Sequence, residues 1–193
     1  MKKVNSSPLD YKYFKELPLH KAYTLSEAGP VVMIATQNGG KPNVMTLSWH
    51  MVTDFTPQFA FLTGPWNYSY KALVKNKECV IAIPTVDIAQ KVVKAGACSG
   101  EDTDKFAKFN FTPLKAKFVK APLVKQCYAN IECRIIDHIK KHNIFVLQGV
   151  AAWIDGKRKE KRFFHAVGDG TFIADGKKIN LRKLMKNKLP DGV

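Results

Sequence analysis

The stretch VVMIATQNGGKPNVMTLSWHMVT, residues 31–53, decides the fold class of this chain. It contains two apolar, β-branched runs, 31–37 and 44–53, on either side of a turn at 38–43 that begins Asn-Gly. Asn-Gly between two such runs is the strongest short-range signal for a β-hairpin, because both residues tolerate the positive φ angles of a tight turn. The stretch therefore predicts two neighbouring antiparallel strands.

Strand patterns continue after this hairpin. Apolar runs bounded by turn residues predict further strands at 58–63, 78–83, 116–119, 126–137 and 143–154. A final hairpin is predicted around 168–170, with a second turn at 175–176. Because hairpins join consecutive strands, the sheet is predicted to be antiparallel and to close into a barrel.

Short helices are predicted between the strands, at 69–76, 86–94, 102–109 and 181–189. Asn67 or Ser69 is expected to cap the first helix, and Thr85 or Asp87 the second. The helices cluster in the middle of the chain instead of alternating with strands, which argues against a doubly wound parallel sheet. The predicted fold class is mainly β with a few short helices.

Length and composition indicate one folded domain. The chain has 193 residues, of which 46% are hydrophobic, enough for a real core and too many for a disordered chain. No uncharged apolar run approaches the roughly 20 residues that span a bilayer. The N-terminal sequence MKKVNSSPLDYKYF lacks the apolar stretch of a secretory signal. We therefore expect a cytoplasmic protein without a membrane segment.

The charge balance is strongly basic. Lys and Arg number 31 against 16 Asp and Glu, a net charge of +15. Such a charge is compatible with nucleic-acid binding. However, 27 of the basic residues are Lys and only four are Arg, whereas Arg is the residue that reads bases with two hydrogen bonds. Nucleic acid is therefore an unlikely partner, and a solubilising surface or an anionic ligand is the favoured reading.

The four cysteines are Cys79, Cys98, Cys127 and Cys133. None forms a C-x-x-C motif, so neither a zinc knuckle nor a thioredoxin-type site is indicated, and no metal is expected. Cys127 and Cys133 would share one face of a strand, because strand side chains repeat every two residues. Free thiols in a buried, reducing environment are the expectation.

No nucleotide or nucleophile motif is present. Gly168-Asp169-Gly170 lacks the third glycine and the helix of a dinucleotide fingerprint. Instead, small polar and aromatic residues are dense at 43–50 and 63–69. A flat, amphipathic cofactor needs this mixture of stacking faces and hydrogen-bonding groups. The helix predicted to start after Asn67 offers N–H groups to a phosphate. The same residues could equally form an ordinary strand, turn and helix.

Several ordered segments resemble the flavin reductase-like family, and within it the flavoredoxins. They are PNVMTLSWHMVTDFTPQFAF, GPWNYSYKAL, ECVIAIPT, CSGEDTDKF, APLVKQCYANIECRIID and HAVGDGTFIADGKKI. The resemblance covers residues from about 25 to 180, so the chain is treated as a single domain, 1–193, with a basic C-terminal extension at 181–193. It implies an FMN-binding split β-barrel of Greek-key order.

The resemblance also carries flavin contacts onto matching positions. The isoalloxazine would be lined, largely by backbone groups, by Asn43, Met45, Thr46, Leu47 and Ser48, with Trp49 beside the ring. The ribityl chain and phosphate would be held by Thr63, Asn67, Tyr68 and Ser69. The loop formed by Cys98, Ser99 and Gly100 leads to Lys105, whose ammonium would face the anionic cofactor. His142 and Phe164 are further contacts. The residues alone leave open that Trp49 is a core residue and Lys105 a solvated one.

The resemblance implies an FMN-dependent oxidoreductase that forms a homodimer. Its chemistry would belong to the flavin, so no catalytic side chain is expected. Electrons would come from NAD(P)H, docked transiently because no Rossmann unit exists, or from a protein partner, for which the basic surface favours an acidic redox protein. An electron carrier without nicotinamide activity and a basic nucleic-acid-binding barrel are the alternatives.

Overall fold

The hairpin predicted from residues 31–53 forms one edge of a seven-stranded antiparallel sheet. We describe residues 29–54 and 56–185 of a computed structural model. The sheet strands are β1 (Val32–Asn38), β2 (Lys41–Leu47), β3 (His50–Asp54), β4 (Gln58–Leu62), β5 (Glu78–Ile83), β8 (Ala129–Ile139) and β9 (Ile144–Ile154). Gly39 and Gly40, with φ of 55° and 87°, form the β1–β2 turn, and the two positive angles are those that a two-residue hairpin requires.

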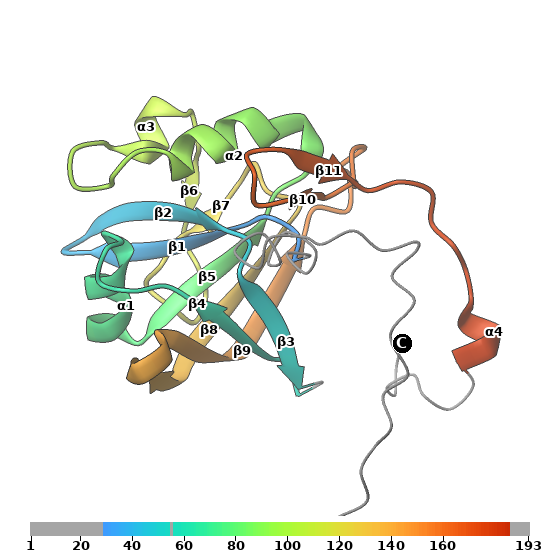
Figure 1. The fold of residues 1–193 in the computed structure, drawn as a ribbon. Coiled ribbons are helices and arrows are strands. Elements are labelled where there is room, and N and C mark those ends of the chain that lie inside the picture. The colour runs from blue at the N-terminus through green and yellow to red at the C-terminus, as the bar shows by residue number, and fades with distance from the viewer. Residues whose placement is uncertain (1–28, 55, 186–193) are drawn as a thin grey trace, which may run out of the picture.

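The two edges of this sheet are consecutive in the chain. The strand order is β2-β1-β5-β8-β9-β4-β3, and only Ser48 and Trp49 separate β2 from β3. The sheet must therefore curl until its edges meet, which produces the predicted barrel (Figure 1). The single strand predicted at 44–53 is thus wrong in detail, because the chain passes from one edge of the sheet to the other at Ser48 and Trp49.

The helices are short and lie outside the barrel strands. They are α1 (Ser69–Asn76), α2 (Ala89–Gly96), α3 (Lys105–Lys108) and α4 (Arg182–Met185), with 3-10 turns η3 (Val86–Ile88) and η4 (Lys140–His142). Figure 1 shows α2 and α3 across β1 and β2, and α1 on the other side of these strands. The helix predicted at 102–109 begins only at Lys105, because the Asp104 carboxylate accepts the Ala107 N–H at 3.0 Å and caps it there.

Alternate side chains of β1 pack in two separate hydrophobic cores. Ile34 points into the barrel, where it packs in one cluster with Phe145 of β9. Met33 points outward, into a second cluster that includes Val92 of α2 and Phe106 of α3. Each fully buried apolar side chain contributes about 1.5–3 kcal/mol relative to an exposed one. The outer core therefore fixes the helices and the loop between them against β1 and β2.

The structure corrects the strand predicted at 116–119, between α3 and β8. Residues 116–119 form no strand; the nearest strands are β6 (Pro113–Leu114) and β7 (Leu123–Val124). The backbone N–H groups of Lys117, Phe118 and Val119 instead donate to the Glu132 carboxylate at 3.0, 2.6 and 3.1 Å. The Trp153 indole N–H also donates to Glu132, at 2.8 Å. Donors directed at one carboxylate are not available to a neighbouring strand.

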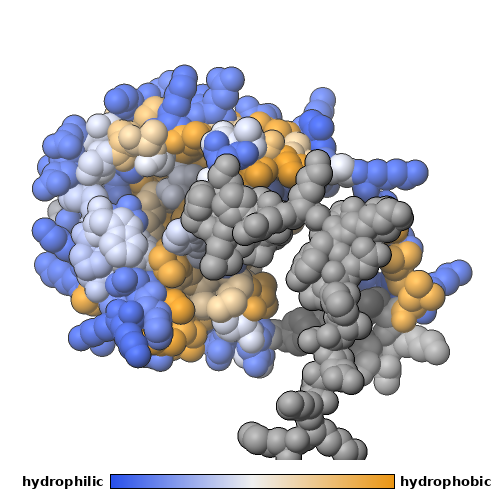
Figure 2. All heavy atoms as spheres, viewed as in Figure 1, coloured by the Kyte–Doolittle hydropathy of each residue, from blue (hydrophilic) through white to orange (hydrophobic). Residues whose placement is uncertain are grey.

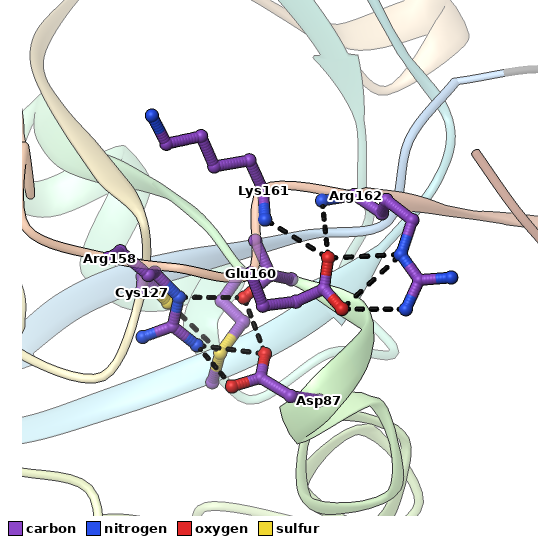
Figure 3. A network of polar contacts seen from close by, with 8 residues as sticks. Asp87, Cys127, Arg158, Glu160, Lys161 and Arg162 are labelled. Atoms are coloured by element: carbon purple, nitrogen blue, oxygen red, sulfur yellow. Dashed lines mark hydrogen bonds and ion pairs between the residues drawn. The ribbon is translucent and has the colours of Figure 1, made fainter. Parts of the chain in front are cut away.

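The basic segment after β9 is held by ion pairs (Figure 3). Arg158 donates to both carboxylate oxygens of Asp87 at 2.9 Å and to the Thr85 hydroxyl at 2.8 Å. Thr85 and Asp87 therefore bind this guanidinium and do not cap the helix as predicted. Burial raises the pKa of Asp87, but hydrogen bonds from Thr85 and Arg158 prevail, and the pKa is lowered from 3.8. Arg162 likewise pairs with Glu160.

The C-terminal hairpin is confirmed. β10 (Phe164–Ala166) pairs with β11 (Phe172–Ala174) around the turn that contains Gly168 and Gly170, both with positive φ. Of the helix predicted at 181–189, residues 182–185 are helical and 186–189 lie outside the described residues. Figure 2 shows hydrophobic residues gathered over α2 and this hairpin, within a mostly hydrophilic surface. None of the helices described is long and apolar enough to cross a membrane.

The four cysteines are free in the structure, and all but Cys98 are buried. Cys79 and Cys133 face each other across β5 and β8 inside the barrel. Cys127 precedes β8 and packs in the outer core, so the prediction that it shares a face with Cys133 is wrong. Burial raises the pKa of Cys127 to about 12, which leaves it a thiol at neutral pH.

Replacement of Glu132 by Gln is expected to lower the free energy of unfolding by about 2–3 kcal/mol, because an amide nitrogen would face buried N–H donors. Burial raises the pKa of Glu132, but the N–H groups of 117–119 and Trp153 outweigh it, so the pKa lies below 4.5. A lowered carboxyl pKa contributes stability above about pH 4.5 that is lost as the pH falls. Urea unfolding should therefore show the mutant and native stabilities converging in acid.

The exposed Glu101 is the control, and Glu101→Gln should change the stability by less than about 0.5 kcal/mol. Equal stabilities of the Glu132 and Glu101 variants at neutral pH would contradict the role given to Glu132.

Candidate functional site

Two cavities flank the turn at the start of α1. The first, here called the Trp49 cavity, has a volume of about 700 Å³ and is lined by Leu47, Ser48, Trp49, Leu62, Trp66, Asn67 and Gly168. The second, the Tyr68 cavity, has about 310 Å³ and is lined by Lys41, Pro42, Asn43, Tyr68, Gly100, Glu101, Asp102, Thr103 and Asp104. Residues predicted from the sequence thus meet in two neighbouring hollows, with Asn67 on one side of the turn and Tyr68 on the other.

The connection between β2 and β3 builds one wall of the Trp49 cavity. Leu47, Ser48 and Trp49 stand where the chain leaves one edge of the sheet for the other, and Trp49 remains 56% exposed. The Trp49 carbonyl accepts the Leu62 N–H at 3.0 Å, which holds this corner to the end of β4. Trp49 is therefore not a core residue, and its indole face is available to a ligand.

A β-turn closes the opposite wall. The Gly64 carbonyl accepts the Asn67 N–H at 3.0 Å, so Gly64, Pro65, Trp66 and Asn67 form a four-residue turn with proline in its second position. Proline favours this position because its ring presets φ. The turn places Trp66 and Asn67 at the cavity, and Trp66 is 66% exposed.

Buried hydrogen bonds connect the predicted polar residues to one another. The Asn43 amide donates to the Ser69 hydroxyl at 2.9 Å, and the Asn67 amide donates to the Thr63 hydroxyl at 3.0 Å. Thr63 in turn donates to the Met45 sulfur at 3.7 Å. Neither Asn67 nor Ser69 caps α1 as predicted, since both are engaged elsewhere and α1 has no side-chain cap. No side chain therefore caps the backbone N–H groups of the first turn of α1, of which that of Tyr70 donates to the Asn67 carbonyl at 3.0 Å.

Thr46 points away from both cavities. Its hydroxyl donates to the Val92 carbonyl of α2 at 2.8 Å, and Gly96 of the same helix packs directly against it. A Cβ on Gly96 would approach the Thr46 Cβ to 2.9 Å, so the absence of a side chain permits the close contact. Thr46 can therefore serve a ligand only through its backbone, whereas its side chain fixes α2 on β2.

The loop after α2 carries the predicted Cys98, Ser99 and Gly100. The Cys98 thiol donates to the Ala95 carbonyl at 3.8 Å, and the Ser99 hydroxyl accepts the Glu101 N–H at 3.1 Å. Gly100 packs against Asn43 and Tyr68 so closely that a Cβ there would collide with both. Only Gly100 of the three lines a cavity.

Lys105 is the unusual charge of this region. Its side chain lies at the start of α3 and is only 4% exposed, so it is not one more solvated lysine. Burial lowers its pKa from 10.5, and Cys98 is the neighbour that raises it in part. Within the described residues the Lys105 ammonium forms no ion pair or hydrogen bond. A buried ammonium without a counterion is unfavourable, and a bound anion would relieve this.

His142 and Phe164 also lie outside both cavities, as do Met45, Thr63, Ser69 and Lys105. His142 is exposed in η4, although the next residue, Asn143, accepts the Thr63 N–H at 3.0 Å. Phe164 is buried in the outer core against Phe172, with ring centroids 5.8 Å apart. Conversely, the contacts predicted from the sequence lacked Leu62, Trp66 and Gly168, which line the Trp49 cavity. Trp66 stands in the dense segment 63–69, but Gly168 carried no sequence signal because only folding brings it there.

Residues 25–169 match the sequence model of a protein family, the flavin reductase like domain. The chain belongs to the flavin reductase-like family. An uncharacterized protein of Archaeoglobus fulgidus is 37% identical over 109 residues, which cover 55% of this chain and 62% of that protein. The chain thus matches under two thirds of the length of this relative.

Solved structures show the same fold. Flavoredoxin of Desulfovibrio vulgaris (Miyazaki F) matches with a TM-score of 0.74 and 21% identity, over 93% of this chain and 96% of that one. An FMN-binding protein from Thermus thermophilus with bound p-hydroxybenzaldehyde matches with a TM-score of 0.70 and 18% identity, over 86% and 95%. These likenesses confirm the predicted split β-barrel.

Replacement of Lys105 by Met is expected to have opposite effects on stability and on binding. Removing a buried, unpaired ammonium should raise the free energy of unfolding of the ligand-free protein by about 1 kcal/mol. The same change should raise the Kd for FMN about tenfold, because an electrostatic contact to the anion is lost. Thermal unfolding and quenching of FMN fluorescence measure the two effects.

Lys108→Met is the matched control, since Lys108 lies one turn later on the same helix and is exposed. It should change neither quantity appreciably. A Lys105 variant that is less stable and binds FMN normally would show that the ammonium serves the fold and not a ligand.

Proposed function

We propose that this chain binds FMN and transfers electrons through it. The Trp49 cavity carries the proposal, because it combines an exposed indole with a lining in which no described residue is ionisable. An uncharged, partly aromatic hollow of about 700 Å³ suits a flat ring system. Family membership and the Thermus thermophilus FMN-binding protein, which has the same fold, support this ligand.

Different groups of residues are assigned to the ring and to the phosphate of FMN, according to their chemistry. The isoalloxazine is assigned to the Trp49 cavity, beside Trp49 and the backbone of Leu47 and Ser48. The phosphate is assigned to the start of α1 near Asn67, where no side chain caps the backbone N–H groups. The Tyr68 cavity suits a phosphate less, since Glu101, Asp102 and Asp104 outnumber its single lysine.

The chain's own groups bind, orient and shield the cofactor. Asn43, Thr63 and Ser69 are buried and hold β2, β4 and α1 together, so their role is to position the turn at 64–68. Lys105 lines neither cavity, but its positive charge would favour a reduced, more negative cofactor nearby. When bound, FMN supplies the reversible uptake and release of electrons. The wide mouth left by the exposed Trp49 and Trp66 gives an electron donor access.

The basic surface favours anionic electron donors. The net charge of +15 is carried mostly by lysines, whereas Arg158 and Arg162 are paired with Asp87 and Glu160. This excess of positive charge creates a field that speeds the approach of NAD(P)H or of an acidic redox protein, and salt weakens it. Because Arg158 and Arg162 are engaged in ion pairs and Arg134 donates to the Phe118 carbonyl, nucleic-acid readout gains no support.

The absorption spectrum of the purified protein tests this proposal. FMN should give the protein a visible flavin spectrum, or added FMN should lose fluorescence on binding. Anaerobic NADH or NADPH should bleach that spectrum if the protein is a nicotinamide-dependent reductase. Bleaching by dithionite alone would identify the electron carrier without nicotinamide activity. A colourless protein that leaves FMN fluorescence unchanged contradicts the proposal.

We also propose that two chains associate through β3. Met51 and Val52 are 56% and 63% exposed, although adjacent strand residues point to opposite faces. Each face of this edge strand therefore presents one exposed apolar side chain. An exposed apolar edge strand is a typical surface for association with another chain. Trp49 directly precedes β3, so association here would also border the Trp49 cavity.

Sedimentation is expected to give twice the 21.7 kDa of one chain. The double variant Met51→Lys, Val52→Lys should sediment as a single chain, because desolvating two charges opposes association. Val74→Lys places a charge on an exposed apolar residue of α1 and should leave the dimer intact. A native protein that sediments as one chain at high concentration contradicts the dimer.

A further inference from the structure

We propose that Trp66 forms a second stacking surface in the Trp49 cavity, where it binds a planar, uncharged aromatic compound beside the cofactor. This inference rests on the proposed function, because Trp49 and the remaining cavity are assigned to FMN. It adds a binding subsite whose ligand class follows from the residues around it.

The three tryptophans of the chain differ in what holds them. The indole N–H of Trp153 donates to the buried Glu132, so this ring is part of the fold. Trp49 and Trp66 both line the cavity and are more than half exposed. Within the described residues, neither indole donates a hydrogen bond or stacks on another ring. Two large aromatic faces in one cavity without protein partners indicate ligand contact.

The local backbone holds Trp66 in place before any ligand arrives. Pro65 restricts the turn, and the Asn67 N–H closes it onto the Gly64 carbonyl. The six-membered ring of Trp66 rests against Gly64, in the space that a side chain there would occupy. A ring positioned in advance loses little freedom on binding, which favours affinity.

The lining selects the charge and shape of the ligand. Ser48 and Asn67 are the only side chains with polar groups other than the two indoles, and Leu47, Leu62 and Gly168 complete the wall. A charged ligand would lose hydration without gaining a counterion. An uncharged planar ring would keep its faces against an indole, and the Asn67 amide could donate to one carbonyl. The volume, about 700 Å³, lies in the upper half of the range for small-molecule sites, which leaves room beside a cofactor.

The test uses the FMN-loaded protein and three probes of similar size. Benzaldehyde is planar and uncharged, cyclohexanecarbaldehyde is uncharged but not planar, and benzoate is planar but charged. Each is titrated while the flavin absorption spectrum is followed, and the Kd for FMN is measured separately. Native protein should bind benzaldehyde at least about tenfold more tightly than either other probe.

Three variants separate the subsite from the cofactor site. Trp66→Ala should raise the Kd for benzaldehyde about tenfold and the Kd for FMN less than about threefold, whereas Trp66→Phe should retain most of the affinity. Gly64→Ala should weaken benzaldehyde binding with Trp66 intact, because the new methyl group displaces its ring. Trp153→Phe is the matched control and should bind benzaldehyde as the native protein does.

Three results would overturn the inference. These are equal affinity for the three probes, a Trp66→Ala variant with native benzaldehyde affinity, and a loss of FMN affinity in that variant as large as its loss of benzaldehyde affinity. Native protein that binds FMN without preferring benzaldehyde refutes this subsite and leaves the proposed function standing. Native protein that does not bind FMN refutes both.

Discussion

The two-residue connection between β2 and β3 is the constraint on which the rest of the structure depends. β2 and β3 are opposite edges of a seven-stranded sheet, yet Ser48 and Trp49 alone separate them. Two edges that are so near in the chain cannot lie far apart in space, so the sheet curls into a barrel, although β2 and β3 each pair with only one strand. The closure also leaves Trp49 at a corner, where its indole cannot enter either core. One connection thus produces both the barrel and the main wall of the site.

Among the described residues, the charged groups Glu132 and Arg158 have hydrogen-bond or ion-pair partners within the fold, whereas the buried Lys105 has none. Glu132 is fully buried, but three backbone N–H groups and an indole N–H saturate its carboxylate. Arg158 is satisfied by Asp87 and Thr85. Lys105 is buried to a similar degree and has no described counterion. Buried charges are tolerated when paired, so Lys105 is the residue for which we propose an interaction with an anion.

The same division applies to the polar residues of the site. Asn43, Thr63 and Ser69 are buried and satisfy one another, and they therefore act on a ligand through the turn that they hold. Asn67 and the two exposed indoles stand at the surface of the cavity, where contact with a ligand is direct. A membership in the flavin reductase-like family names the class of cofactor, but the division between holding and touching comes from burial. It separates residues whose replacement should disturb the turn from those whose replacement should remove a contact.

The sequence by itself determined the local elements. The β1–β2 hairpin follows from Asn38, Gly39 and Gly40, and helix 69–76 was predicted with its observed bounds, because turn chemistry and apolar periodicity act between near neighbours. Partners distant in the chain decided the rest. Residues 117–119 donate their N–H groups to Glu132, and the segment 116–119 forms no strand. Thr85 and Asp87 bind Arg158 and do not cap a helix. Gly168 joined a cavity with Ser48 and Trp49, more than one hundred residues earlier. Such contacts have no local signal, since their free energy appears only when the barrel has closed and brought the segments together.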